Sequence, residues 1–316
     1  MDEDAQQMLT SEVMFSVRGA HRSSLHGREQ ETLFTFSCPS HVLPKSAAKR
    51  ESAEAVEYDS DGDLVVRRRR AEDADELCEE MEVQIRLFHW NSSTVADVGR
   101  QVWRGALYLA DFFLSGAVVT ERETLFEIGC GCGLTAIVAA MCDVGSVVAS
   151  DLEPFLDLAK KNLNVNGALL PRGRRVDVIP FDVIEDVANV PDALRSATLV
   201  YGADVVYDND LSAAIATLME NLLIANPRLK RRRFLFSVEK RFVFTIKDLR
   251  TVAHNFDHFM SKLREKLIDD DSRVRNVYDV EVEVMTGDKV VQRFCYERTP
   301  DVVLIMIEAR LKRTSL

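Results

Sequence analysis

The sequence predicts an α/β fold with a mostly parallel sheet, and three observations support this fold class. After about residue 80, short apolar stretches alternate with longer amphipathic stretches of helical period, a pattern typical of βαβ units. The helical stretches begin and end at residues that favour helix ends, since Pro154 suits a first turn and Asn166 and Gly167 suit a last one. The composition, 47% hydrophobic and 29% charged over 316 residues, is that of an ordinary globular protein.

The elements of this fold can be placed in order along the chain. The strands expected in the parallel part of the sheet are Thr124–Ile128, Ser146–Ser150, Val176–Pro180, Thr198–Ala203 and Phe234–Val238. The helices expected between and after them are Leu134–Met141, Pro154–Asn166, Leu211–Ile224 and Lys247–Leu267. Two later strands, Val277–Val284 and Val302–Glu308, are joined through Thr286–Asp288, which predicts an antiparallel hairpin that closes the sheet.

Residues 1–80 are predicted to be a charged, largely disordered or loosely structured extension ahead of a folded domain at 81–316. An acidic block at 57–63 is followed by the tetrad Arg67–Arg70 and by further acids at 72–76. Opposite charges with few large apolar residues bury too little surface to fold alone. Thr32–Phe36 alternates like a strand, but no partner strand is evident near it. The arginine tetrad fits either a nuclear-import signal or a solvated charge run.

Charge and hydropathy exclude several classes of protein. The chain carries 40 Lys and Arg against 51 Asp and Glu, a net charge of −11, which argues against broad nucleic-acid binding and suits a basic partner. No apolar run approaches the roughly 18 residues of a membrane helix, and the first residues lack the pattern of a secretory signal. The 6 cysteines are few for this length and are expected to be reduced thiols.

A glycine-rich turn is the strongest local signal in the sequence. Residues 125–134 read Leu-Phe-Glu-Ile-Gly-Cys-Gly-Cys-Gly-Leu, so a strand leads through Gly129, Gly131 and Gly133 directly into a helix. Glycines let the backbone turn tightly and approach a ligand closely. The spacing differs from the G-x-G-x-x-G of dinucleotide-binding folds, and such a loop alone also fits a plain strand-to-helix turn. No second Cys or His pair near Cys130 and Cys132 has ligand spacing, so no metal site is expected.

Carboxylates follow the predicted strands at the ends where a ligand would bind. Glu127, Asp151, Asp182 and Asp204 lie at or near the carboxyl ends of four successive strands. Because the carboxyl ends of parallel strands face one crevice, we expect these side chains to converge on one rim. Four acids suit a ligand with hydroxyls, an amino group and a positive centre better than they suit a pyrophosphate. S-adenosylmethionine, with its ribose, ammonium and sulfonium groups, is such a ligand.

The motifs together resemble those of a known enzyme family. Glu127–Leu134, Asp151, Phe181-Asp182 and Ala203-Asp-Val-Val-Tyr-Asp208 are similar to the motifs of seven-β-strand (class I) protein-lysine methyltransferases of the methyltransferase-like 21 group. Upstream, residues 97–106, Asp-Val-Gly-Arg-Gln-Val-Trp-Arg-Gly-Ala, resemble the Trp-Gly-Ala element of that family. The resemblance extends over about residues 83–310. It implies a Rossmann-like, seven-stranded sheet with helices on both faces, and S-adenosylmethionine as the cofactor.

The resemblance also implies a role for each matching residue. The expected cofactor-binding residues are Glu127, Gly129, Gly131 and Gly133 at the methionine part, Asp151 at the ribose, Asp182 at the adenine amino group, and Trp103 and Ala203 nearby. Asp204 and Tyr207 are the expected catalytic residues, placed where the methyl group meets the incoming lysine. Val183 departs from the pattern, because relatives often carry Trp there. Glu239–Arg241, after the fifth strand, fits either a salt-bridged edge or part of the substrate cleft.

The function expected from these features is transfer of a methyl group to a lysine of a protein substrate. Such an enzyme must present a neutral amine, although a free lysine has a pKa of about 10.4, and aromatic walls lower that pKa by desolvation. A basic or nucleic-acid-associated protein would suit the charge. Direct nucleic-acid binding and membrane association are not expected, and we expect a monomer in the nucleus or cytoplasm. Two alternatives stay open: a catalytically weak module that binds a basic partner, and a methyltransferase acting on RNA or a small molecule.

Overall fold

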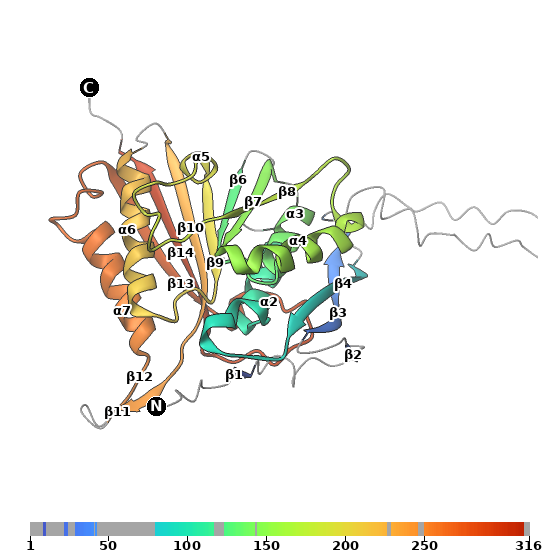
Figure 1. Cartoon of the computed structure of the whole chain (residues 1–316). Coiled ribbons are helices and arrows are strands. Elements are labelled where there is room, and N and C mark those ends of the chain that lie inside the picture. The colour runs from blue at the N-terminus through green and yellow to red at the C-terminus, as the bar shows by residue number, and fades with distance from the viewer. Residues whose placement is uncertain are drawn as a thin grey trace, which may run out of the picture.

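A seven-stranded sheet forms the centre of the molecule in the computed structural model, which describes residues 9–10, 22–24, 29–40, 42, 80–116, 123–142, 144–225, 229–245 and 250–312 (Figure 1). The strand order is β13-β14-β10-β9-β6-β7-β8. These strands are β6 (Thr124–Ile128), β7 (Ser146–Asp151), β8 (Val176–Pro180), β9 (Leu199–Ala203), β10 (Arg231–Glu239), β13 (Tyr278–Thr286) and β14 (Val302–Leu311). β6 to β10 pair in parallel and β14 lies antiparallel to both of its neighbours. The predicted fold class is therefore confirmed.

Helices cover both faces of this sheet because side chains alternate along each strand. In β9, Leu199 and Tyr201 belong to one hydrophobic core and Val200, between them, belongs to the other. The first core is covered by α2 (Arg104–Leu114), α3 (Leu134–Met141) and α4 (Leu156–Val165). The second is covered by α5 (Asp192–Ser196), α6 (Asn209–Ala225) and α7 (His254–Leu263), which continues as a π-helical turn at Arg264–Ile268.

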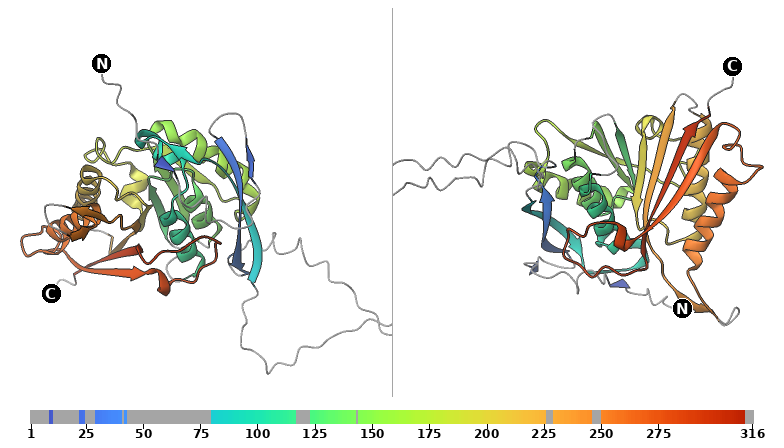
Figure 2. Two further views of the ribbon diagram at one scale, coloured as in Figure 1. Left: turned by 90° about the horizontal axis from the view of Figure 1, so that it is seen from below. Right: turned by 180° about the vertical axis from the view of Figure 1, so that it is seen from behind.

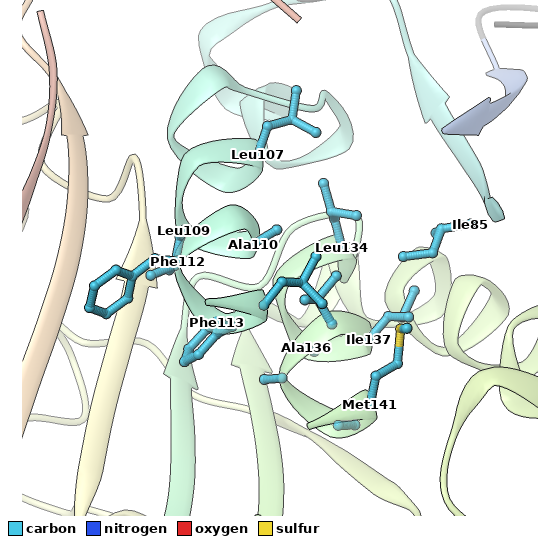
Figure 3. Packing of buried hydrophobic residues seen from close by; sticks show 14 of the residues in the cluster. Ile85, Leu107, Leu109, Ala110, Phe112, Phe113, Leu134, Ala136, Ile137 and Met141 are labelled. Atoms are coloured by element: carbon cyan, nitrogen blue, oxygen red, sulfur yellow. The ribbon is translucent and has the colours of Figure 1, made fainter. Parts of the chain in front are cut away.

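The helix α2 has no counterpart among the predicted elements. All of its residues except Ala106 are buried. Figure 3 shows Ala110 and Phe113 of α2 close to α3, with Ile85 of a separate strand on the far side of α3. Phe113 also meets Tyr201 of the central sheet edge to face, with ring centroids 5.0 Å apart. This packing holds the amino end of α2 over the carboxyl ends of the strands.

A second, three-stranded sheet lies apart from the central one and includes two strands from residues 1–80. It consists of β2 (Arg22–Ser24), β3 (Glu29–Pro39) and β4 (Glu80–Trp90), and Figure 2 shows β3 and β4 side by side, away from the central sheet. Thr32–Phe36, for which no partner was evident nearby, pairs along its whole length with β4, which begins at Glu80 beyond the charged segment, and β2 also pairs with β3 as far as Thr32. Phe34 and Phe36 are 2% exposed and join the first core, so the extension contributes a strand to the folded domain. The acidic block and the arginine tetrad lie outside the described residues.

Two asparagines, Asn162 of α4 and Asn166 at its C-cap, attach this second sheet to the rest of the domain. Asn166 accepts a hydrogen bond from the Arg86 backbone N–H (3.0 Å) and donates one to the Arg86 carbonyl (2.7 Å). Asn162 forms the same pair of bonds with Phe88 at 2.8 and 2.9 Å. Asn162 also donates to the carbonyl of Cys132 in the glycine loop (2.8 Å). The amides therefore satisfy the free edge of β4 and connect it to the glycine loop.

Two predicted elements differ from the structure near the carboxyl terminus. β13 and β14 pair as expected, but a loop from Gly287 to Asp301 joins them, where a tight turn at Thr286–Asp288 was predicted. The buried Asp111 holds this loop, since its Oδ1 accepts from the backbone N–H of Arg293 and Phe294, both at 2.9 Å. These contacts are remote in sequence and leave no local signal.

The predicted helix Lys247–Leu267 is shorter than expected. α7 begins at His254, and Arg250–Val252 instead forms β12, which pairs with β11 (Val243–Thr245). The two short segments Leu9–Thr10 (β1) and Ser92–Ser93 (β5) also pair. Three-residue helical turns lie at Glu153–Phe155, Gly167–Leu169 and Gly287–Lys289, and a longer one lies at Val95–Arg100. Within the described ranges, no helix has the length and apolar character needed to cross a bilayer.

Candidate functional site

A cavity of about 550 Å³ lies at the carboxyl ends of the parallel strands. This volume is within the range of small-molecule and cofactor sites, and the position is the one at which open α/β sheets bind ligands. Among the predicted site residues, those that line the cavity are Trp103, Gly129, Gly131, Asp151, Asp182, Ala203, Asp204 and Tyr207. Glu127 and Gly133 do not line it, and Arg241 does.

The glycine loop forms the floor of the cavity, and two of its glycines cannot be replaced without displacing a neighbour. Gly129 and Gly131 have φ of 66° and 52°, a region that favours glycine. A Cβ on Gly129 would stand 2.7 Å from Val205 Cγ1, and one on Gly131 would stand 2.8 Å from the backbone oxygen of Gly99. Gly133 follows as the N-cap of α3. The loop therefore presents bare backbone to the cavity.

Asp151 connects the end of β7 to this loop. Its Oδ2 accepts a hydrogen bond from the Gly131 backbone N–H (2.6 Å) and its Oδ1 accepts one from the Leu152 N–H (2.7 Å). Burial raises the pKa of Asp151 to about 6, and these two bonds oppose the shift. A carboxylate oxygen has two lone pairs, so each oxygen retains the capacity to accept a hydroxyl donor from a ligand.

Glu127 lies behind the loop, where the resemblance had implied contact with the cofactor. Its side chain points to the face of the sheet covered by α3, where it accepts hydrogen bonds from the hydroxyls of Thr135 and Tyr201. The carboxyl group is fully buried, and burial raises its pKa to about 8. The structure therefore gives Glu127 a supporting position that joins β6, α3 and β9. Its neighbour Ile128, which lines the cavity, belongs to the second core on the opposite face of the sheet, as the alternation along β6 requires.

Asp204 joins three segments at the other end of the cavity. Its Oδ2 accepts from the Gly105 N–H in the first turn of α2 (2.7 Å), and its Oδ1 accepts from the Glu239 N–H at the end of β10 (3.0 Å). Asp204 has a φ of 52°, in the left-handed region. Burial raises its pKa to about 6, while the positive charge of Arg241 opposes that shift. Both oxygens are thus held in one orientation.

Gly105 is the residue that allows this approach. A Cβ at Gly105 would lie 2.5 Å from Asp204 Oδ2, closer than any real Cβ contact. The glycine in the Trp-Arg-Gly-Ala stretch is therefore required by the carboxylate that faces it. Sequence reasoning identified both residues in separate motifs but did not connect them, because they are 99 positions apart.

Two aromatic side chains, Trp103 and Tyr207, also line the cavity. The indole N–H of Trp103 donates to the Val98 carbonyl (3.0 Å), and the Arg241 guanidinium lies 5.0 Å from the centroid of the Trp103 ring. Tyr207 is 39% exposed, and partial burial raises the pKa of its hydroxyl. The guanidinium stacks on the indole at the distance of a cation–π contact. This end of the cavity therefore combines aromatic walls with a carboxylate.

Asp182 and the residues after it form the opposite rim. Asp182 Oδ1 accepts from the backbone N–H of Ile184 (2.9 Å) and of Glu185 (3.3 Å), which turns the chain at the end of β8. Phe181 and Val183 are 4% and 5% exposed and also line the cavity. Val183 thus supplies an apolar wall of the cavity.

The cysteines of the loop serve as packing groups. Cys132 donates to the carbonyls of Gly99 (3.6 Å) and Gln101 (3.5 Å), and burial raises the pKa of both Cys130 and Cys132 above the ordinary value. In the part of the chain that the structure describes, no group of three or more His, Cys, Asp or Glu residues is arranged to hold a metal ion.

Comparison with known proteins finds one family model and several methyltransferase-like relatives that match the chain. The profile of the family described as lysine methyltransferase matches residues 82–266. Methyltransferase-like protein 22 of Mus musculus is 32% identical over 262 residues, which cover 68% of this chain and 65% of that protein. The Homo sapiens protein of the same name is 32% identical over 264 residues, covering 70% of this chain and 64% of that protein. This chain thus spans slightly less than two thirds of the length of these two relatives.

A third relative connects the chain to the group that its motifs resemble. Protein N-lysine methyltransferase METTL21A of Danio rerio is 31% identical over 164 residues, which cover 48% of this chain and 71% of that protein. The profile covers the glycine loop, Asp151, Asp182, Asp204 and Tyr207 in one continuous match. The resemblance inferred from these motifs is confirmed.

Proposed function

The chain belongs to the lysine methyltransferase family, and we propose that it transfers a methyl group from S-adenosylmethionine to the side-chain amine of a lysine in a protein substrate. The observation that carries this proposal is the arrangement of the cavity lining. The strand order places Asp151, at the end of β7, and Asp204, after β9, on either side of the glycine loop that follows β6, and Trp103 and Tyr207 line the same cavity. A cofactor and an amine can therefore meet within one enclosed space.

The residues of the cavity fit S-adenosylmethionine. Gly129 and Gly131 line the cavity without side chains, so the ligand can lie directly on the backbone. Asp151 can accept the ribose hydroxyls, and Asp182, beside apolar Phe181 and Val183, can meet the adenine end. When bound, this cofactor would supply a methyl group on a positively charged sulfur, and the carboxylates around the cavity suit that charge.

The aromatic end would prepare the lysine amine. A lysine must lose its proton before it attacks, and enclosure by Trp103 and Tyr207 would lower its pKa by removing water from the charged form. Enclosure also fixes the amine in line with the methyl group, which is the main contribution that an enzyme makes to a displacement of this kind. Asp204 would orient the lysine amine or the cofactor. We assign proton removal to water and a positioning role to Asp204, whose two oxygens hold the backbone N–H groups of Gly105 and Glu239.

The test is incubation of the protein with S-adenosylmethionine carrying a labelled methyl group and a cell lysate, followed by mass spectrometry of the labelled products. We expect label on lysine side chains of protein, and we expect none with Asp151→Ala, which should lose cofactor binding. Label in RNA or in small molecules, with none in protein, would contradict the proposal. Failure of the wild-type protein to bind S-adenosylmethionine in calorimetry would support an interaction module that binds a basic partner.

We also propose that the protein acts in the nucleus or cytoplasm, as a monomer, on a basic or nucleic-acid-associated protein. The net charge of −11 supports a basic partner. Imaging of the tagged protein with and without alanine at Arg67–Arg70 tests the nuclear part of this proposal. Retention of the nuclear signal in the alanine variant would show that the arginines are not needed for import.

A further inference from the structure

Arg241 is the single Lys or Arg among the described residues that line the cavity. It follows β10 directly and leads into the ribbon formed by β11 and β12, which Figure 1 shows extending beyond the end of β10. The acids that share the cavity lining are Asp151, Asp182, Asp204 and Asp208. A lone cation at the aromatic end of an acidic cavity is not needed to attract a cationic lysine, so its presence there requires another explanation.

The acids nearest to Arg241 are already bonded to other groups. Glu239, two residues earlier, forms an ion pair with Arg104 (2.6 Å), and both oxygens of Asp204 accept backbone N–H groups. Among the residues that the structure describes, no carboxylate forms an ion pair with Arg241. The guanidinium uses one flat face on Trp103, and stacking of this kind leaves the N–H groups at its edge able to bind a carboxylate.

The position of Arg241 is on the substrate side of the cavity. Its charge acts on Asp204 and Tyr207 and opposes the rise in both pKa values, and these two residues lie at the end assigned to the lysine. An approaching lysine ammonium would be repelled by a guanidinium at this place. A substrate that carries a carboxylate beside its lysine would replace that repulsion with an ion pair.

We propose that Arg241 determines substrate specificity by pairing with an Asp or Glu side chain that lies beside the target lysine of the protein substrate. This inference rests on the proposed protein-lysine methyltransferase function. Phe242 and Val243 follow Arg241 and are 49% and 51% exposed, so they offer apolar surface next to the cation. The substrate segment that fits best therefore places an acid next to the lysine and an apolar side chain beyond the acid.

The experiment measures kcat and KM for the protein substrate that the labelling experiment identifies, and the Kd for S-adenosylmethionine by calorimetry. For Arg241→Gln we expect KM for the protein to rise about tenfold, with kcat and cofactor Kd within about twofold of wild type. Arg241→Lys should keep most of the affinity. Lys240→Gln is the matched control, because it removes one positive charge from the adjacent residue, whose ammonium lies over Phe256 (4.4 Å) and outside the cavity lining.

A charge exchange supplies the decisive comparison. If the pair exists, changing the neighbouring acid of the substrate to Gln should raise KM little further when the enzyme is Arg241→Gln. The Arg241→Glu enzyme should have a lower KM for a substrate whose acid is changed to Arg than for the original substrate. A target lysine without any acid beside it, or an unchanged KM in Arg241→Gln, would overturn the proposal. A rise of about tenfold in cofactor Kd alone would overturn it too, by assigning the guanidinium to the cofactor carboxylate. If wild type methylates no protein lysine, the proposed function itself fails, a result distinct from these.

Discussion

Replacement of Gly105 by Ala tests whether the contact between α2 and Asp204 controls both stability and activity. Alanine is normally the better helix former, by about 0.8 to 1 kcal/mol in a helix interior. Here, however, the added Cβ would stand 2.5 Å from Oδ2 and 2.6 Å from Cγ of the half-buried Asp204. The carboxylate must therefore withdraw, and the 2.7 Å hydrogen bond from the Gly105 N–H is lost.

The two effects have opposite signs, and their magnitudes favour destabilisation. A hydrogen bond to a charged group contributes about 1.5 to 3 kcal/mol, which exceeds the gain in helix propensity. We therefore expect Gly105→Ala to lower the free energy of unfolding by about 1 to 2 kcal/mol. A displacement of the carboxylate by about 1 Å at the reacting end should lower kcat by about a hundredfold.

Urea unfolding and steady-state methylation of one protein substrate provide the two measurements. Gly167→Ala is the matched control, because Gly167 begins a short helical turn and a Cβ there would meet nothing within 4 Å. This control should be as stable as wild type or slightly more stable, with full activity. Gly105→Ala with wild-type stability and activity would refute the reasoning, since it would show that helix propensity outweighs the contact with Asp204.

Three further predictions concern the groups behind and beneath the cavity. The pKa of Asp151 is about 6, and ribose hydroxyls bind its charged form. Calorimetry should therefore show the affinity for S-adenosylmethionine weakening as pH falls below 6, by up to about tenfold per pH unit. The pKa of Glu127 is about 8 in the folded protein, above its unfolded value of 4.5. The contribution of Glu127 to stability is therefore fully present below pH 4.5 and is lost as pH rises through 8. Glu127→Gln should remove this loss, as measured by urea unfolding at a series of pH values. Asn162→Leu leaves the Phe88 N–H and the carbonyls of Phe88 and Cys132 without their partner and should lower the free energy of unfolding by about 3 kcal/mol or more.

Each of these predictions has its own control. Asp151→Asn should bind the cofactor weakly at every pH, and a persistent pH dependence in that variant would assign the effect to another group, such as Asp204. Equal slopes of stability against pH in wild type and Glu127→Gln would show that Glu127 is not protonated when folded. Asn164→Leu changes an exposed asparagine of the same helix, and a similar loss of stability in this variant would remove the special role of Asn162.

The elements predicted most closely are those whose signals are local. β6, β8 and α3 have the predicted bounds, because a short apolar run predicts a strand and the glycine turn between β6 and α3 marks where the strand ends and the helix begins. The grouping of Asp151, Asp182 and Asp204 at one cavity also followed from local reasoning, since any acid after a parallel strand lies at the same edge of the sheet.

The errors fall where partners are distant in sequence. Thr32–Phe36 had the alternation of a strand, but its pairing with β4 depends on chain that follows a long charged segment. The loop before β14 is held by Asp111, and Glu127 is turned from the cavity toward Thr135 and Tyr201. The strand pairing, the loop position and the orientation of Glu127 each depend on which distant groups become buried together, and this cannot be predicted from a single stretch of sequence.

The sequence by itself determined the parallel sheet, the glycine loop and the set of acids at the strand ends, because these depend on backbone conformation and on side-chain alternation. Only the tertiary structure decided the state of each acid. Asp204 meets the first turn of α2, Asp151 meets the glycine loop, and Glu127 is enclosed behind it. The physical reason is that burial and hydrogen bonding, which set the charge and orientation of a carboxylate, arise from segments that approach one another only when the whole chain has folded.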